Sequence, residues 1–192
     1  MQLSLTYLWQ GLLLSGLSGL GFFLVYQVNE LFEPWSEYGQ GVNLLFLPAG
    51  IKHVAVLIAG PWGALGCCVS LFILALDFWH GTPTGQIATY SLISTGATWL
   101  GIILSLRMLG VDADLTRLKF IHLPLMDLVT TAIHGFTTNA YFTLTGMKSG
   151  DFLVHSLAMM VGDFTGSLVV LSLLWLALLW IRRKMTPKTP AD

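Results

Sequence analysis

The stretch NLLFLPAGIKHVAVLIAG, residues 43–60, decides the fold class, because it is apolar over nearly the length of chain that crosses a bilayer as a helix. Lys52 and His53 lie near its centre. A charged side chain at that depth costs about 2.5–3.5 kcal/mol on insertion scales, so it is normally paired, faces the interior of a helix bundle and marks a functional site. The stretch therefore predicts a membrane helix that carries part of an intramembrane polar site.

Two later apolar stretches carry ionisable side chains in the same way. FIHLPLMDLVTTAIHGFTTNAYF contains Asp127 and His134, and FLVHSLAMMVGDFTGSLVVL contains His155 and Asp163. At about 100° per residue, Asp127 and His134 fall on one face of a helix. Groups at similar depth can pair across a bundle, so the leading predicted pair is Lys52 with Asp163. The alternative is Lys52 with Asp127.

A second candidate pair, Asp77 with His155, lies toward the outer side of the membrane. The competing interpretation is that all these side chains only join helices, since interhelical polar contacts are common and contribute about 0.6 kcal/mol on average. A lysine at the midplane is hard to explain in that way, so we expect a polar pocket that recognises a ligand or a proton state. The predicted cluster consists of Lys52, His53, Asp77, Asp127, His134, His155 and Asp163.

The composition places the chain among integral membrane proteins. Of its 192 residues, 55% are hydrophobic and 10% are charged, and the mean hydropathy is +0.74. A soluble domain carries about 25% charged residues. The net charge of -1, without a basic stripe, excludes a nucleic-acid-binding protein.

Motifs for chemistry are missing from the sequence. No serine–histidine–acid constellation, metalloprotease motif or phosphate-binding glycine loop is present, so we expect a protein that is not an enzyme. The adjacent Cys67 and Cys68 predict neither a disulfide framework nor a zinc site. A haem between His134 and His155 would need the two rings at similar depth, which their positions do not favour. No metal is predicted, and the identity of any cofactor stays open.

Hydropathy predicts an all-α polytopic membrane protein with both termini cytoplasmic, in a prokaryotic cytoplasmic membrane. One transmembrane domain is expected over residues 1–184, followed by a short polar tail over 185–192. The predicted helices cover residues 5–27, 44–60, 62–80, 87–109, 119–145 and 151–182. Only Gly60-Pro61-Trp62-Gly63 separates the second from the third, so a single kinked segment or a re-entrant pair is the alternative.

Basic residues orient this topology, because cytoplasmic loops carry the excess of lysine and arginine. Lys148 then lies outside and Lys52 lies within the membrane. The loop NELFEPWSEYGQG faces outward, and a short interfacial helix is expected in it. The basic residues placed inside are Arg107, Arg117, Lys119, Arg182, Arg183, Lys184 and Lys188.

Small residues predict close helix contacts at two places. Gly11, Ser15 and Gly19 form a ridge on the first helix that suits packing within the bundle or against another subunit. Pro48 and Gly50, just before the charged pair of the second helix, suit a kink where a ligand or another backbone comes near.

Two short segments resemble membrane-associated sensor domains of the MASE type. NLLFLPAGIKHVAVLIAGPWGALG resembles the helix that carries a Trp-Pro-x-x-Gly-like motif, with Leu47 in place of the tryptophan. VGDFTGSLVVL, with Gly162, Asp163 and Gly166, resembles a Gly-Asp-x-x-Gly segment near the end of that domain. The resemblance implies a sensory input domain. With no output domain in these 192 residues, a membrane or signalling protein is the expected partner.

A weaker resemblance links the chain to the substrate-binding components of energy-coupling-factor vitamin transporters. Those proteins have a similar length, six helices and a small-residue ridge on the first helix. The resemblance implies a ligand pocket that opens outward, with Trp35, Tyr38, Asp77 and His155 as contacts. The expected function is therefore a sensor-like domain. The alternatives are a transporter subunit or a structural subunit of a membrane complex.

Overall fold

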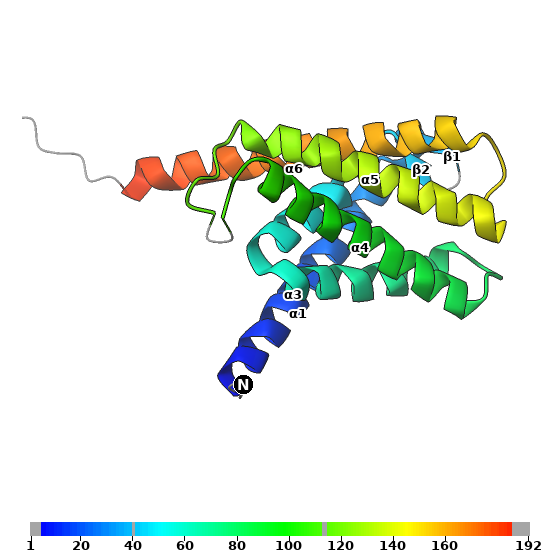
Figure 1. Ribbon diagram of the computed structural model, residues 1–192, viewed down its shortest axis with the longest axis horizontal. Coiled ribbons are helices and arrows are strands. Elements are labelled where there is room, and N and C mark those ends of the chain that lie inside the picture. Colours follow the sequence, from blue (N-terminus) through cyan, green and yellow to red (C-terminus); the bar gives the residue numbers. More distant parts are fainter. Residues whose placement is uncertain (1–4, 40, 113–114, 186–192) are drawn as a thin grey trace, which may run out of the picture.

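The computed structural model describes residues 5–39, 41–112 and 115–185, and this part of the chain is almost entirely helical (Figure 1). The predicted tail over residues 185–192 lies outside the described residues, apart from its first residue. The elements are α1 (Leu5–Glu30), α2 (Glu33–Ser36), β1 (Glu37–Gly39), β2 (Val42–Asn43), α3 (Leu47–Phe78), α4 (Thr84–Met108), α5 (His122–Thr145) and α6 (Phe152–Met185).

Helix α3 occupies the centre of the bundle, where it contacts α1, α4 and α6, while α5 packs between α4 and α6. Four of the described helices are long and apolar enough to cross a membrane, namely α1, α3, α4 and most of α6. The prediction of an all-α protein with helices that can span a membrane is confirmed, while the six spans and the cytoplasmic side of both termini stay predictions. Helix α5 has the length to span but is more polar, because its buried face carries the charged and threonine side chains of the site.

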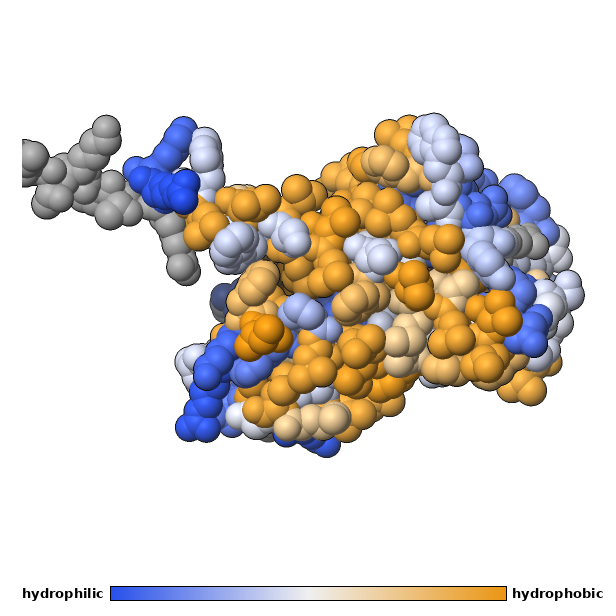
Figure 2. All heavy atoms as spheres, turned by 90° about the horizontal axis from the view of Figure 1, so that it is seen from above, coloured by the Kyte–Doolittle hydropathy of each residue, from blue (hydrophilic) through white to orange (hydrophobic). Residues whose placement is uncertain are grey.

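The surface agrees with a membrane environment. Figure 2 shows apolar residues over the middle of the viewed face and hydrophilic residues gathered toward its two ends. Large hydrophobic side chains on α1 and α6 are exposed, including Leu13, Leu17, Leu173 and Trp180. Such a broad apolar surface is unusual for a soluble monomer and suits contact with lipid.

Helix α3 covers both the predicted second and the predicted third helix. The chain reverses direction between its two halves, at Gly60, in the tight turn that was expected there. Gly60 has φ 56° and ψ −130°, a backbone conformation that glycine adopts without the strain of a β-carbon. Gly63 then lies against the carbonyl of Ala55, so the second half of α3 folds back on the first. The first half, residues 47–59, is about 20 Å long and therefore shorter than the roughly 30 Å hydrocarbon layer.

The predicted kink at Pro48 is wrong in its position, because the proline lies in the first turn of α3. The helix begins at Leu47, three residues after the predicted start of the second helix, and its first turn tolerates a residue without an N–H. The Leu47 N–H donates to Asn29 Oδ1 at 2.8 Å, which satisfies one of the free donors of the helix end. Gly50 lies in close contact with Ser167 and Val170 of α6. Another helix therefore does come near at this point, as the sequence predicted.

The loop between α1 and α3 contains the short helix that was expected there, α2, and also a two-stranded hairpin that was not. Strands β1 and β2 pair antiparallel, and Val42 of β2 is almost fully buried. The chain beyond β2 lies on α6, where Phe46 N donates to Gly162 O at 3.0 Å and Thr165 Oγ1 donates to Leu44 O at 2.7 Å. The loop is therefore anchored to the bundle.

The small-residue ridge of α1 is buried inside the protein. Gly11, Ser15 and Gly19 all face α3, and a β-carbon on Gly66 of α3 would overlap the Ser15 carbonyl. Ser70 of α3 donates to Gly19 O at 2.7 Å. Of the two uses that the sequence allowed, the ridge serves packing within the bundle.

Candidate functional site

Four buried polar side chains from four different helix segments meet near the middle of the bundle. Lys52 Nζ of α3 lies 3.2 Å from Ser94 Oγ of α4 and 3.3 Å from His134 Nε2 of α5. Ser94 Oγ lies 2.8 Å from His134 Nε2, and His134 Nδ1 lies 2.5 Å from Asp163 Oδ2 of α6. We call Lys52, Ser94, His134 and Asp163 the Lys52 network.

The hydrogen bonds of the Lys52 network define one consistent set of donors. A carboxylate only accepts, so His134 donates to Asp163 through Nδ1–H, and its Nε2 is then an acceptor. The Ser94 hydroxyl donates to Nε2, and the Lys52 ammonium donates to the Ser94 oxygen. The network thus joins a lysine to a carboxylate through the imidazole of His134, which satisfies the need to pair ionisable groups away from water.

A second buried pair lies beside this network. His53 Nδ1 is 3.1 Å from Asp127 Oδ1, and both side chains are at most 1% exposed. His53 follows Lys52 on α3, while Asp127 lies two helical turns before His134 on α5. The face of α5 that carries Asp127, Thr131, His134 and Thr138 is buried, as its helical spacing predicted.

A cavity of about 60 Å³ extends from the Lys52 network toward the end of the bundle that holds the α1–α3 connection. All four members of the network line it, and Glu33, Val42 and Asn43 border it at the connection. By the usual measure of about 10–15 Å³ per water, it has room for a few waters or a small ligand group. Its apolar walls include Phe22, Tyr26, Leu71, Leu74, Trp79 and Tyr90.

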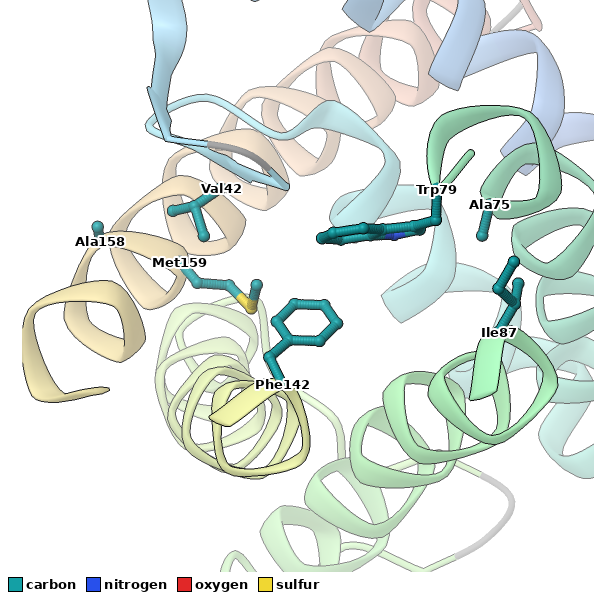
Figure 3. Close-up of a cluster of buried hydrophobic side chains, with 7 residues drawn as sticks. All are labelled: Val42, Ala75, Trp79, Ile87, Phe142, Ala158 and Met159. Atoms are coloured by element: carbon teal, nitrogen blue, oxygen red, sulfur yellow. The ribbon is translucent and has the colours of Figure 1, made fainter. Parts of the chain in front are cut away.

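The wall at the connection is a cluster of packed apolar side chains. Figure 3 shows Val42, Trp79, Phe142 and Met159 directed toward one another from β2, the end of α3, α5 and α6. The Trp79 and Phe142 rings lie 5.3 Å apart between centroids, within the range of favourable aromatic pairs. The hairpin therefore contributes part of the cavity wall through Val42.

The rim of the cavity is acidic. Burial, with Glu37 and Glu30 nearby, raises the pKa of the Glu33 carboxyl above its usual value. Repulsion within this group disfavours further negative charge at the entrance. Negative charge is therefore concentrated at this side of the cavity.

Of the pairs predicted from sequence, none forms as a direct ion pair among the described residues. Lys52 and Asp163 lie in one network but are joined through His134, because the imidazole fills the space between them. The alternative, Lys52 with Asp127, is replaced by His53 with Asp127.

The second predicted pair, Asp77 with His155, does not form among the described residues. Asp77 is exposed near the end of α3. His155 instead contacts the Asp151 carbonyl at 2.8 Å and the Tyr38 ring. Both residues lie outside the lining of the cavity.

Sequence reasoning missed Ser94 and the series that it forms with His134 and Asp163. The three side chains are connected in the order of a serine–histidine–acid triad, but they come from three helices, so no local motif could have indicated the series. Ser94 lies inside α4, where the backbone N–H groups are used by the helix and cannot form an oxyanion hole. The arrangement suits binding and proton sharing better than acyl transfer.

The Gly-Asp-x-x-Gly segment now has a physical explanation. β-Carbons on Gly162 and Gly166 would overlap the carbonyl oxygens of Asn43 and Phe46, so the two glycines admit the chain that leads into α3. Asp163 lies between them and faces the network. The segment therefore combines a close backbone contact with the acidic member of the site.

Within the described residues, no group of three or more histidine, cysteine, aspartate or glutamate side chains is placed to hold a metal ion. Comparison of the chain with protein-family models, with curated proteins and with solved structures finds no match.

Proposed function

We propose that this protein is a non-enzymatic, sensor-like protein of the prokaryotic cytoplasmic membrane that recognises a small molecule in the cavity above the Lys52 network. One observation carries the proposal: the same cavity is lined by aromatic side chains along its walls and by the Lys52 network at its inner end. Binding sites typically combine mostly apolar walls with a few convergent polar groups. Buried ionisable groups in a membrane bundle are expected to mark such a site.

The chemistry of the cavity selects a ligand that is apolar over most of its surface and uncharged overall. The opposite charges of Lys52 and Asp163 already balance within the floor, and Glu33 belongs to an acidic rim that repels anions. The Lys52 ammonium and the Ser94 hydroxyl offer donors to a ligand head group that accepts hydrogen bonds. The aromatic walls favour a flat apolar body.

The orientation follows from the distribution of basic residues. Arg107, Arg117, Lys119 and Arg183 lie at or beyond the ends of α4, α5 and α6 that face away from the hairpin. The positive-inside rule makes that end cytoplasmic, with both termini on that side. The cavity then opens outward beneath the hairpin.

Signalling requires that the ligand favour one arrangement of the bundle over another. Lys52 lies in the short first half of α3, between the anchored loop and the reversal at Gly60. A ligand that takes hydrogen bonds from Lys52 and Ser94 competes with their bonds to His134, which connects α3, α4, α5 and α6. These four helices then shift relative to one another, and a partner protein that contacts them responds to the shift.

The second candidate is a substrate-binding subunit of a transporter, which the outward cavity also suits. In that case the small-residue ridge would not provide the partner surface, because Ser15 and Gly19 are buried against α3. The two candidates differ in the partner that remains bound to the protein in its own membrane.

Native mass spectrometry of the gently extracted protein tests both candidates. The expected result is a retained small-molecule mass in the wild type and in the control His155→Ala, and loss of that mass in Lys52→Met. A signalling protein in the complex favours the sensor, and coupling subunits favour the transporter. A retained mass that Lys52→Met leaves unchanged would show that the cavity is not the binding site.

A further inference from the structure

A second, smaller cavity of about 10 Å³ lies on the far side of the Lys52 network from the hairpin. It lies between the two histidine–aspartate pairs, and both pairs line it: His53 with Asp127, and His134 with Asp163. Its lining also includes Thr130 of α5. The cavity is therefore the place where the network and the second pair come together.

Four buried polar atoms of these lining residues have no hydrogen-bond partner among the described residues: His53 Nε2, Asp127 Oδ2, Thr130 Oγ1 and Ser167 Oγ. A buried polar atom left without a partner costs about 1–3 kcal/mol. Proteins satisfy such atoms with internal waters that make about three hydrogen bonds each. The cavity is close to the roughly 10–15 Å³ that one water needs.

We infer that this cavity holds an internal water that joins the two histidine–aspartate pairs into one proton relay. When the His134–Asp163 pair has taken up an extra proton, it passes that proton to the water, and the water donates one of its own to His53 Nε2. The charge of the first pair then falls by one and that of the second rises by one, as His53 becomes an imidazolium beside the Asp127 carboxylate. The same steps in reverse return the proton toward the ligand cavity.

The charges around the relay limit it to one extra proton at a time. Lys52, on the first half of α3, lies close to both His53 and His134, and its positive charge repels a second positive charge nearby. The two histidines are therefore not both protonated at once. The other titratable groups close by are Cys67 and Cys68 on the second half of α3, Tyr90 on α4 and Tyr26 on α1. None of these four carries a charge near neutral pH at its ordinary pKa.

The role of the relay rests on the proposed function, because a ligand that takes hydrogen bonds from Ser94 and Lys52 changes the proton affinity of His134. Ligand binding would then be coupled to proton uptake or release at His53. The relay itself can be tested without any ligand. Failure of the relay is therefore distinguishable from failure of the binding proposal.

The experiment is ¹⁵N NMR of histidine-labelled full-length protein in lipid nanodiscs, titrated from about pH 4 to about pH 10, which spans the ordinary range of histidine. Coupled groups titrate in shared macroscopic steps. His53 and His134 are therefore expected to show the same inflection points. His80, His122 and His155 lie outside the relay and serve as internal references.

Two threonine variants provide a matched comparison. Thr130 and Thr138 are both buried on α5 with an unpartnered hydroxyl, but only Thr130 lines the smaller cavity. Thr130→Val is expected to give His53 and His134 separate titrations, and Thr138→Val is expected to keep the shared steps. Independent titration in the wild type, no titration in this pH range, or equal behaviour of the two variants would each overturn the relay.

Discussion

Replacing Asp163 by asparagine removes the negative charge of the Lys52 network while it keeps the shape of the side chain. Asp163 is 3% exposed and Lys52 is 2% exposed, so neither charge is screened by water. In the variant, Lys52 keeps its hydrogen bond to Ser94 and its contact with His134 but loses the charge that balances it. The variant therefore tests whether the network works through charge or only through hydrogen bonds.

Two magnitudes bracket the result. An interhelical hydrogen bond in a membrane contributes about 0.6 kcal/mol, whereas leaving one partner of a buried charge pair alone costs about 3–5 kcal/mol. Because the Lys52 ammonium has no access to solvent, we expect Asp163→Asn to lower the free energy of unfolding by about 3 kcal/mol. The double variant Lys52→Met/Asp163→Asn removes both charges, so it should cost about 2 kcal/mol less than the sum of the single changes.

Equilibrium unfolding in mixed micelles, followed by tryptophan fluorescence, gives these free energies. Asp77→Asn is the matched control, because Asp77 is exposed near the end of α3 and its change should stay within about 0.5 kcal/mol. The reasoning is refuted if Asp163→Asn costs no more than Asp77→Asn. Strictly additive effects in the double-variant cycle would show that Lys52 and Asp163 do not interact through His134.

Three further predictions concern packing, pH and topology. Gly66→Ala should lower the free energy of unfolding by about 2 kcal/mol or more, because the added β-carbon would overlap the backbone of α1. Gly96→Ala on α4, where a β-carbon has open space, should instead raise it by about 0.5–1 kcal/mol. Burial lowers the pKa of Lys148 from 10.5 to about 8, so between these values the unfolded chain holds a proton that the folded chain has lost. Stability should therefore rise with pH across this window, and Lys148→Met should flatten the rise. The orientation can be tested in a variant whose native cysteines are replaced. Tyr38→Cys should then react with an impermeant thiol reagent in intact cells, and Arg183→Cys should react only after permeabilisation. The opposite pattern would reverse the proposed orientation.

The membrane class and the importance of the buried charges could be predicted from the sequence alone. Apolar stretches long enough to span a bilayer are a local property of the chain, and so is an ionisable residue inside one. The burial of Lys52, His53, Asp127, His134 and Asp163 follows from the same argument, since lipid solvates none of these groups. The turn at Gly60-Pro61 was also visible locally, because the two residue types disfavour a continuous helix.

Only the tertiary structure decided which of these groups meet. Depth along a helix predicted that Lys52 and Asp163 were neighbours, but depth does not specify rotation, so the intervening His134 was not foreseen. Ser94 carries no signal in its own segment, and Asp77 and His155 share a depth but not a contact. Hydropathy depends on each residue and its neighbours in the chain, whereas a hydrogen-bond network depends on how separate helices pack, and that information exists only once they are assembled.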